Sequence, residues 1–383
     1  MLTSAFAALK VVHLTSVHGR GDTRIFVKEC RTLAHHAYQV SLVVADGNGD
    51  AVVDGVSIHD VGRPASRLQR MLRTGGSVFR RACAIDGDIY HLHDPELIPI
   101  GLRLKRLGKI VIFDAHEDLP KQLLSKPYLS PPLRWLLSRS FGRFEQRVCA
   151  TLDGIVAATP SIRDKFLKIN PRTVDVSNYP LPAEFDGSAD WNDKAREVCY
   201  VGGLGATRGI RELVQACVML QSSTRLSLAG NFSESKLQTE MRSLPGWQQV
   251  DMHGHLDRAG VRRVMARAIA GLVTLHPTSN YIEALPVKMF EYMAAGIPVI
   301  ASDFPLWRSI IEAEHCGICV DPLDVKAIAE AIDYLAAHPK VACQMGANGR
   351  RAVMATYNWA PQATRLLEFY GAIAHANKIR VAA

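Results

Sequence analysis

The segment 197–220 reads EVCYVGGLGATRGIRELVQACVML and joins three patterns in direct succession. Its first five residues are mostly apolar and predict a buried strand, and the spacing of apolar residues from Ile210 to Leu220 predicts a helix. Four glycines lie between them, at positions 202, 203, 205 and 209. A strand that leads through a glycine-rich turn into a helix is typical of βαβ units. The segment therefore predicts a parallel sheet with helices on its faces.

The same alternation continues from this segment toward both ends of the chain. Strands are expected at 10–15, 39–44, 88–93, 110–114 and 154–158, and then at 197–201, 225–229, 249–252, 271–275, 298–301 and 317–320, with helical patterns between them. We therefore predict an α/β protein of two Rossmann-like, doubly wound parallel-sheet domains that face each other across a cleft. Residues 1–182 would form the first domain and 183–360 the second. The polar, proline-containing segment from 178 to about 196 is the expected linker.

Length and composition allow this architecture and exclude several others. The 383 residues are 48% apolar and 21% charged. This fits two folded domains and excludes a collagen, a disulfide mini-scaffold and a largely disordered chain. No apolar run reaches the roughly 18 residues of a membrane-spanning helix. The N-terminus also lacks the basic region of a signal peptide, so a cytoplasmic protein is expected.

Cysteine usage agrees with that expectation. The eight cysteines are scattered along the chain, as in proteins of a reducing compartment. Cys316 and Cys319 form the one close pair. Because no second pair of ligands lies nearby, this spacing favours neither a zinc site nor a redox site.

Positive charge is concentrated in two regions of the first domain, although the net charge of +8 is small for this length. Region 61–85 contains six arginines and no acid. Region 119–150 contains six bases and one acid, Glu145, with large apolar residues between them. Such a stretch can lie on an anionic membrane surface or bind a polyanion; the alternative is a pair of solvated helix faces. No nucleic-acid motif accompanies the charge, so no nucleic-acid partner is expected.

In the second domain, glycines and polar residues follow the expected strands, at the sheet edge where parallel α/β domains bind ligands. Gly202 and Gly203 would let the backbone approach a phosphate. Arg208 could pair with a diphosphate beside the N-terminus of the next helix. Gly230 and His253 follow the next two strands. The turn does not match the P-loop pattern, and an ordinary tight turn is the alternative.

The stretch 280–303, NYIEALPVKMFEYMAAGIPVIASD, contains the strongest signal. Glu291 stands on an expected helix beside Phe290 and Met293. A carboxylate on a buried face needs a hydrogen-bonding partner. A pair of ligand hydroxyls, such as a ribose diol, would supply one; a solvent-facing glutamate is the alternative.

Glu283 and Glu291 are separated by seven residues, and EYMAAGIPVIAS begins at the second of them. This resembles the E-x7-E motif of the family-4 retaining glycosyltransferases, which have two facing Rossmann-like domains. The resemblance covers nearly the whole chain and points to a subgroup that builds bacterial surface polysaccharides. Its further motifs are GDTRIF (21–26), HLHDPEL (91–97), DAHED (114–118) and YVGGL (200–204). It also implies that the last helix, about 361–383, packs back on the first domain.

The resemblance implies a role for each matching residue. Glu291 would hold the ribose of a nucleotide sugar, Glu283 would contact the sugar, and the segment around His253 would flank the base. The implied catalytic set is His116, Glu283 and Arg208. The donor-binding set, with our own candidate Lys288 included, is Gly202, Gly203, Arg208, Gly230, His253, Lys288 and Glu291. The acceptor or cleft set is Gly19, Arg20, Asp22, His93, Asp94 and Glu117.

Two features depart from the family pattern. Gly203 stands where many members carry a phosphate-binding arginine, so one cation is missing. Lys288, one turn before Glu291, is the candidate to replace it; a lysine on an exposed helix face is the alternative. The segment between the two glutamates is also poor in glycine, which leaves the contact of Glu283 with the sugar open.

These observations predict a retaining glycosyltransferase that moves a sugar from a nucleotide-diphosphate donor to a saccharide or lipid-linked acceptor. No metal or other cofactor is expected, because cations and helix N-termini can neutralise the leaving phosphate and no D-x-D pair stands among apolar strand residues. The protein would be cytoplasmic, or peripheral on the inner membrane face through 119–150. The alternatives are a non-catalytic partner subunit of the same fold, a nucleotide-sugar epimerase, and a phosphorylase with a pyridoxal-phosphate lysine.

Overall fold

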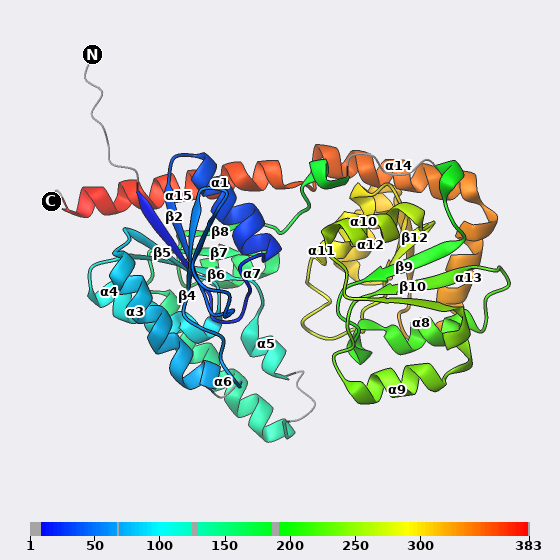
Figure 1. The fold of residues 1–383 in the computed structure, drawn as a ribbon, viewed down its shortest axis with the longest axis horizontal. Coiled ribbons are helices and arrows are strands. Elements are labelled where there is room, and N and C mark those ends of the chain that lie inside the picture. Colours follow the sequence, from blue (N-terminus) through cyan, green and yellow to red (C-terminus); the bar gives the residue numbers. More distant parts are fainter. Residues whose placement is uncertain (1–8, 67–68, 125–128, 186–190, 382–383) are drawn as a thin grey trace, which may run out of the picture. The chain divides into compact units, whose positions relative to one another are not determined.

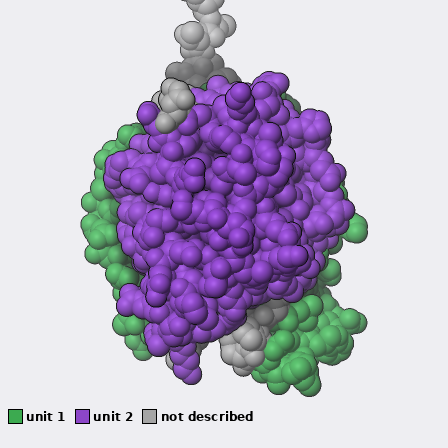
Figure 2. Space-filling view, turned by 90° about the vertical axis from the view of Figure 1, so that its right-hand side faces the viewer, with its two compact units in different colours: residues 1–178, 360–383 green, residues 179–359 purple. Residues whose placement is uncertain are grey.

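A computed structural model describes residues 9–66, 69–124, 129–185 and 191–381. The chain forms two compact units (Figure 2): unit 1 comprises residues 1–178 and 360–383, and unit 2 comprises residues 179–359. Each is an α/β unit built around a mostly parallel sheet. Arg67 and Lys126, two of the clustered bases, lie outside the described residues.

Unit 1 contains an eight-stranded sheet with the order β3-β4-β2-β1-β5-β6-β7-β8. The strands are β1 (Lys10–Leu14), β2 (Gln39–Val44), β3 (Ala51–Val53), β4 (Val56–Asp60), β5 (Ile89–Leu92), β6 (Ile110–Ala115), β7 (Gly154–Ala157) and β8 (Thr173–Asp175). All neighbours are parallel except β3 and β4. The sequence analysis missed β3, β4 and β8, which are short strands at the two ends of the sheet and lack a long apolar run.

Helices cover both faces of this sheet (Figure 1). They are η1 (Thr23–Cys30), α1 (Arg31–His35), η2 (Arg70–Thr74), α3 (Gly75–Ile85), η3 (Pro95–Leu97), α4 (Ile98–Arg106), α5 (Leu119–Leu124), α6 (Pro131–Cys149), α7 (Pro160–Leu167) and α15 (Trp359–Val381). Val12, Leu14 and Phe113 belong to the apolar core of one face, together with side chains of α3, α4, α6 and α7. The opposite face is different, because buried histidines and charged groups occupy its centre.

The last helix, α15 (red in Figure 1), packs on this second face of unit 1. Tyr370 Oη lies 2.7 Å from His91 Nδ1 on β5. Gln362 Oε1 accepts a hydrogen bond from the backbone of Ser177 at 2.9 Å. A Cβ on Gly154 of β7 would lie 2.4 Å from the Phe369 ring, so glycine is required there for the ring to approach the strand. These contacts tie the chain's C-terminal helix to its N-terminal sheet.

Unit 2 contains a six-stranded, fully parallel sheet with the order β11-β10-β9-β12-β13-β14. The strands are β9 (Glu197–Val201), β10 (Arg225–Ala229), β11 (Val250–Gly254), β12 (Ala270–Val273), β13 (Val299–Ser302) and β14 (Gly317–Val320). The helices are η4 (Pro182–Phe185), η5 (Trp191–Asp193), η6 (Ala206–Arg208), α8 (Ile210–Cys217), α9 (Ser235–Ser243), η7 (Pro245–Gln249), α10 (Arg258–Arg267), α11 (Val287–Ala294), α12 (Pro305–Glu314), α13 (Val325–Ala337) and α14 (Pro339–Ala355). Apolar clusters cover both faces of the sheet, as expected for parallel strands.

The expected linker is part of unit 2 rather than a free connection. Phe185 is buried in the core of unit 2, and its carbonyl accepts a hydrogen bond of 3.0 Å from Arg350. Trp191 packs against the other apolar cluster of that unit. The boundary therefore lies at 178/179, at the start of the polar segment. Two aromatic side chains anchor the segment, because burying each removes a large apolar surface from water.

No helix among the described residues combines the length and the apolarity that a bilayer crossing demands.

Candidate functional site

The glycine-rich turn of unit 2 brings two pieces of backbone into contact at the ends of β9 and β10. Gly202 has φ +122° and Gly230 has φ +151°, values that side-chain-bearing residues rarely adopt. A Cβ on Gly230 would lie 1.9 Å from the Gly202 carbonyl oxygen. Glycine at both positions therefore keeps the turn open and free of side chains.

Lys288, from the first turn of α11, extends into this turn. Its Nζ is buried, lies 3.7 Å from the centre of the Tyr200 ring, and has no hydrogen-bond partner in the part of the chain that the structure describes. A Cβ on Gly202 would lie 3.2 Å from this Nζ and 3.8 Å from Arg208 Nη1. Burial and the charge of Arg208 lower the pKa of Lys288 well below its usual value. A buried cation beside bare backbone is the arrangement of an anion site, and the alternative of an exposed lysine is wrong.

Arg208 lies beside the unusual glycine at position 203. Nη1 is 3.5 Å from the Gly203 carbonyl, and a Cβ on Gly203 would lie 3.4 Å from Nη1. The guanidinium therefore occupies the space next to position 203. Arg208 and Lys288 thus place two cationic side chains beside the turn, where the sequence alone indicated the loss of one.

The other predicted donor residues occupy different environments. Glu291 is half-buried on α11, and its negative charge partly opposes the lowering of the Lys288 pKa. Glu283 is exposed in the turn that precedes α11. His253 is exposed at the end of β11, with Nε2 3.2 Å from Ser227 Oγ. The structure therefore unites Gly202, Gly203, Arg208, Gly230 and Lys288 around the turn.

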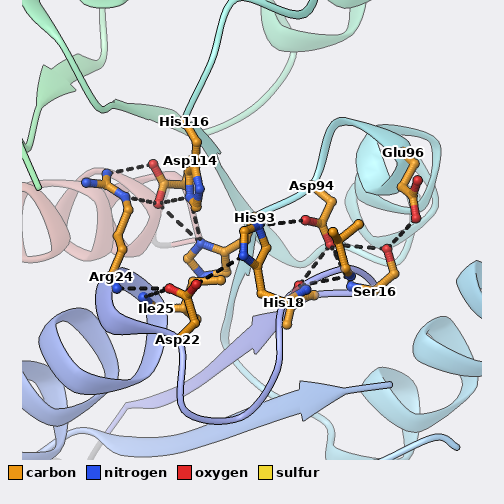
Figure 3. Close-up of polar contacts among 12 residues, drawn as sticks. Ser16, His18, Asp22, Arg24, Ile25, His93, Asp94, Glu96, Asp114 and His116 are labelled. Carbon is orange, nitrogen blue, oxygen red and sulfur yellow. Dashed lines mark hydrogen bonds and ion pairs between the residues drawn. The ribbon is translucent and has the colours of Figure 1, made fainter. Parts of the chain in front are cut away.

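In unit 1, polar side chains gather at the carboxyl ends of β1, β5 and β6 (Figure 3). We call His18, Asp22, Asp94 and His116 the edge cluster. Asp22 caps η1, because its Oδ1 accepts hydrogen bonds from the backbone of Arg24 and Ile25, both at 2.9 Å. Burial would raise the pKa of Asp22, but the hydrogen bonds of His18 and Ile25 hold it well below its usual value. The motif GDTRIF is thus a helix start.

His18 lies between two carboxylates and was absent from the predicted site residues. Its Nδ1 is 3.1 Å from Asp22 Oδ2 and its Nε2 is 3.5 Å from Asp94 Oδ1. Burial opposes protonation, yet the hydrogen bond of Asp22 and the charge of Asp94 raise the pKa of His18. Its ring centroid is 5.6 Å from that of His116. The signal in the sequence was the spacing of His18 and Asp22, four residues apart.

His116 contacts the buried ion pair of Arg24 and Asp114 from its partly exposed side. Its Nε2 lies 2.7 Å from Asp114 Oδ2, and the Arg24 guanidinium binds both oxygens of Asp114 at 2.9 and 2.8 Å. Arg24 and Asp114 are buried, whereas the His116 side chain is 19% exposed. Burial would raise the pKa of Asp114, but the charges of Arg24 and His116 hold it well below its usual value. This pairing fixes the orientation of the His116 ring.

Four predicted acceptor or cleft residues lie outside the edge cluster. His93 is fully buried behind it, and its Nδ1 lies 3.2 Å from Asp114 Oδ2. Arg20 is paired with Asp46 at 2.7 Å. Glu117 is exposed and accepts a hydrogen bond from Gln122, and Gly19 is exposed in the loop before Asp22. Asp94 is in the cluster but buried, because Ser16 and Thr15 donate to it.

The basic region 119–150 folds as two helices, and α6 presents apolar side chains to solvent. Trp135 is 59% exposed and Leu136 is 54% exposed, with Leu133 and Leu137 also exposed beside them. The Arg139 guanidinium lies 5.5 Å from the centre of the Trp135 ring. Glu145, the one acid, is buried and bonded to Lys165 at 2.6 Å. The outer surface of α6 is therefore basic and apolar.

Cys316 is buried and Cys319 is half-buried, and both are free thiols. Burial raises the pKa of each to about 12, so the thiolates that bind metals are disfavoured.

Comparison with known proteins identifies the family of both halves of the chain. A model described as Glycosyltransferase Family 4 matches residues 20–177, and one described as Glycosyl transferases group 1 matches residues 183–352. The chain is 28% identical over 325 residues to a phosphatidyl-myo-inositol mannosyltransferase of Mycobacterium leprae, covering 83% of this chain and 79% of that protein. It is 26% identical over 302 residues to the D-rhamnosyltransferase WbpZ of Pseudomonas aeruginosa, covering 74% of each.

A solved structure shares the fold. The sucrose-phosphate synthase of Thermosynechococcus elongatus superposes with a TM-score of 0.77 at 17% identity, over 96% of this chain and all of that chain. With both halves of the sequence matched, and with relatives that are named as sugar transferases, the chain belongs to the family-4 glycosyltransferases of the two-domain, B-type fold and is itself a glycosyltransferase.

Proposed function

We propose that the protein transfers a sugar, with retention of configuration, from a nucleotide-diphosphate donor to a lipid-linked saccharide acceptor in cell-surface polysaccharide biosynthesis. The observation that carries this proposal is the buried Lys288 amine at the glycine turn, which has no hydrogen-bond partner among the described residues. Burial makes its charged form costly, and a diphosphate would supply the counter-charge and hydrogen bonds that the charged form needs.

The donor diphosphate would bind at the glycine turn of unit 2. Arg208 and Lys288 are the two cations beside it, and the Gly202 backbone leaves room for phosphate oxygens. Helix α8 begins just after the turn, and the free N–H groups at the N-terminus of this helix favour an anion. These groups can neutralise the departing phosphate, so we propose that no metal is needed at the diphosphate. Glu291 would hold the ribose hydroxyls, Glu283 the sugar, and His253 would lie beside the base.

Transfer would proceed on one face of the sugar. The bond between the anomeric carbon and the phosphate oxygen breaks as the bond to the acceptor oxygen forms, and the acceptor hydroxyl proton passes to the departing phosphate. Groups that stabilise the developing phosphate charge then accelerate the reaction. His116 and the edge cluster of unit 1 would bind hydroxyl groups of the sugar or the acceptor, since carboxylate-backed imidazoles are oriented hydrogen-bonding groups.

A lipid-linked acceptor is supported by the surface of α6. Its exposed tryptophan and leucines stand among arginines, a combination that binds anionic bilayer surfaces. One relative is named for a phosphatidylinositol acceptor. The enzyme would then meet its acceptor at the inner face of the membrane.

The first experiment is a thermal-shift screen of the purified protein with UDP-, GDP-, ADP- and dTDP-sugars, with and without EDTA. Stabilisation by one nucleotide class, unchanged by EDTA, supports the proposed donor site and names the nucleotide. No shift with any donor would contradict it and favour a non-catalytic partner subunit. Release of nucleotide only when an acceptor is added would separate transfer from epimerisation.

Calorimetry with the donor found in the screen tests the role of Glu291. The substitution Glu291→Ala should weaken binding by about 1–3 kcal/mol, because it removes charge-assisted hydrogen bonds to the ribose. Glu330→Ala, on an exposed part of α13 in the same unit, is the control and should bind normally. Equal affinities of the two variants would exclude the ribose assignment.

Sedimentation with anionic vesicles tests the α6 surface. The double substitution Trp135→Ser, Leu136→Ser should lower the bound fraction by removing apolar area from the membrane contact. The control is Leu107→Ser, which removes an exposed leucine elsewhere in unit 1. If the parent and the double variant sediment to the same extent, the α6 surface does not bind the membrane and is merely exposed to solvent.

A further inference from the structure

Three side chains meet at the carboxylate of Asp114 on β6 (Figure 3). Arg24 on η1 donates to Oδ1 from Nη2 at 2.8 Å and to Oδ2 from Nε at 2.9 Å. His93, just after β5, places Nδ1 3.2 Å from Oδ2, and His116, just after β6, places Nε2 2.7 Å from the same oxygen. The charge of Arg24 holds the carboxylate ionised against the cost of burial. Because an ionised carboxylate only accepts, both imidazole nitrogens must carry a proton.

On its buried side, His93 contacts a second imidazole. His93 Nε2 lies 2.8 Å from Nδ1 of His13 on β1, and both side chains are buried. Burial lowers the pKa of both histidines, so both rings are neutral near neutral pH. A neutral imidazole has one protonated and one bare nitrogen. Since Nδ1 of His93 carries the proton, its Nε2 is bare and accepts a hydrogen bond from the Nδ1–H of His13.

The inner end of this chain of hydrogen bonds agrees with that order of protons. With its proton on Nδ1, His13 has a bare Nε2, and this atom is buried without a hydrogen-bond partner among the described residues. The reverse order would leave the same atom unpaired, as a buried N–H. It would also turn a bare nitrogen of His93 toward the Asp114 carboxylate, where two acceptors would face each other with no proton between them. The order with protons on both Nδ1 atoms is therefore favoured.

The outer end of the chain is His116, whose side chain is partly exposed. Its Nε2 donates to Asp114, so Nδ1 is the bare nitrogen of the neutral ring. We propose that His13 and His93 are positioning residues for His116. Through the Asp114 carboxylate they hold the His116 proton on Nε2, which leaves Nδ1 to accept a hydrogen bond from a substrate hydroxyl. This inference rests on the proposed function, in which His116 binds a hydroxyl of the sugar or the acceptor.

His93 affects His116 because the two rings share one carboxylate oxygen. A hydrogen bond to a carboxylate oxygen withdraws negative charge from it. Without His93, Oδ2 would hold a second proton on the His116 ring more strongly, and the imidazolium, which has no bare nitrogen, would persist to higher pH. The other charged or titratable groups around His116 do not change when His93 is substituted: Arg24 and Glu29 on η1, His18 and Asp22 after β1, Asp94 after β5, and Glu117.

Nitrogen NMR of the full-length protein with isotope-labelled histidine tests the order of protons directly, because bare and protonated ring nitrogens resonate far apart. The signals are assigned by their loss in His13→Gln, His93→Asn and His116→Gln. At about pH 8, where histidines are neutral, the parent should carry protons on Nδ1 of His13 and His93 and on Nε2 of His116. Nδ1–H is the minor form of a free histidine side chain, so finding it in two buried rings is a specific result. A proton on His93 Nε2, or a bare Nε2 in His116, would overturn the proposal.

The pH profile of kcat/KM tests the positioning role. His93→Leu removes a donor to Asp114, so the acidic limb of the profile should move to higher pH. His93→Asn, whose amide can still donate to Asp114, should restore the profile toward that of the parent. The control is His91→Leu, which removes a neighbouring buried histidine that contacts Tyr370 instead of Asp114 and should leave the profile unchanged. An unmoved limb in His93→Leu, or equal movement in His91→Leu, would overturn the proposal.

The two measurements separate this inference from the proposed function. The NMR result is read from the free parent protein, so it decides the order of protons even if no donor supports transfer or a variant fails to fold. Melting curves show which variants fold like the parent. Transfer activity together with the wrong order of protons would overturn the inference about His13 and His93 and leave the proposed function intact.

Discussion

The two units differ in how their polar side chains are partnered at the same place in the fold, the carboxyl ends of a parallel sheet. In unit 1, Arg24, Asp114, His116, Asp22 and His18 are bonded to one another. In unit 2, the buried Lys288 amine has no hydrogen-bond partner among the described residues. The groups of the first arrangement satisfy one another. An anion would satisfy the second, which is why we propose the donor site in unit 2.

The largest change in stability is expected when the buried ion pair between Arg24 and Asp114 in unit 1 is broken. Asp114→Asn removes the carboxylate that binds the buried Arg24 guanidinium through both oxygens and leaves it the 3.1 Å contact with Glu29. Breaking a buried pair of this kind costs about 3–5 kcal/mol. Urea unfolding followed by circular dichroism measures this loss. The control is Asp251→Asn, whose ion pair with Arg225 is exposed and contributes about 0–1 kcal/mol. A loss no larger than that of the control would mean that the buried pair contributes no more than a surface pair.

In unit 2, a substitution is expected to raise the free energy of unfolding rather than to lower it. Lys288→Met replaces an unpartnered buried amine with an apolar chain of similar length. The free protein should gain about 1–3 kcal/mol in its free energy of unfolding, the cost of a buried unsatisfied polar group. Donor affinity should fall at the same time. Lys326→Met, at an exposed position on α13, is the control and should change neither quantity. A less stable variant would show that Lys288 already has its partner within the chain.

Proton uptake on donor binding is a finer test of the same contrast. The pKa of Lys288 is lowered by burial and by Arg208 in the free protein, and a bound diphosphate would raise it again. Binding should therefore take up protons, and donor affinity should decrease as pH rises between the two pKa values. Calorimetry in buffers with different ionisation enthalpies measures the uptake. The uptake should disappear in Lys288→Met; identical uptake in the parent and the variant would assign it to another group.

The smallest effect is expected at His18. Its pKa is raised in the folded protein, against burial, by the Asp22 hydrogen bond and the Asp94 charge. A raised pKa means that protonated His18 stabilises the fold below the unfolded value of about 6.5, and that this contribution is lost as pH rises through the folded pKa. The melting temperature of the parent should exceed that of His18→Gln by more at about pH 6 than at about pH 8. A difference that grows with pH would contradict the assignment.

The order of elements could be predicted from the sequence because each long buried strand leaves an apolar run and each helix a repeating pattern. Helices lie between the expected strands, as predicted, for example α11 (Val287–Ala294) and α13 (Val325–Ala337). β3, β4 and β8 left no such run, because short strands near a sheet edge need little apolar surface. The sequence did not show that the expected linker belongs to unit 2, because Phe185 and Trp191 stand alone among polar residues. Their burial depends on distant partners such as Arg350, 165 residues from Phe185.

The glycine turn was predictable in part because its residues are neighbours in the sequence. Gly202, Gly203 and Arg208 lie within seven positions, and their chemistry is evident from the residue types. The sequence alone also determined the alternation of strands and helices and the family resemblance, since both are carried by short contiguous patterns. The position of Lys288 required the packing of α11 on the sheet, which places its amine over the ring of Tyr200 on β9. The tertiary structure alone decided that His93 is buried, that His18 lies between two carboxylates, and that His116, Asp114 and Arg24 form one unit. These side chains come from segments as far as 90 residues apart, and only strand pairing within the sheet brings them within hydrogen-bonding distance.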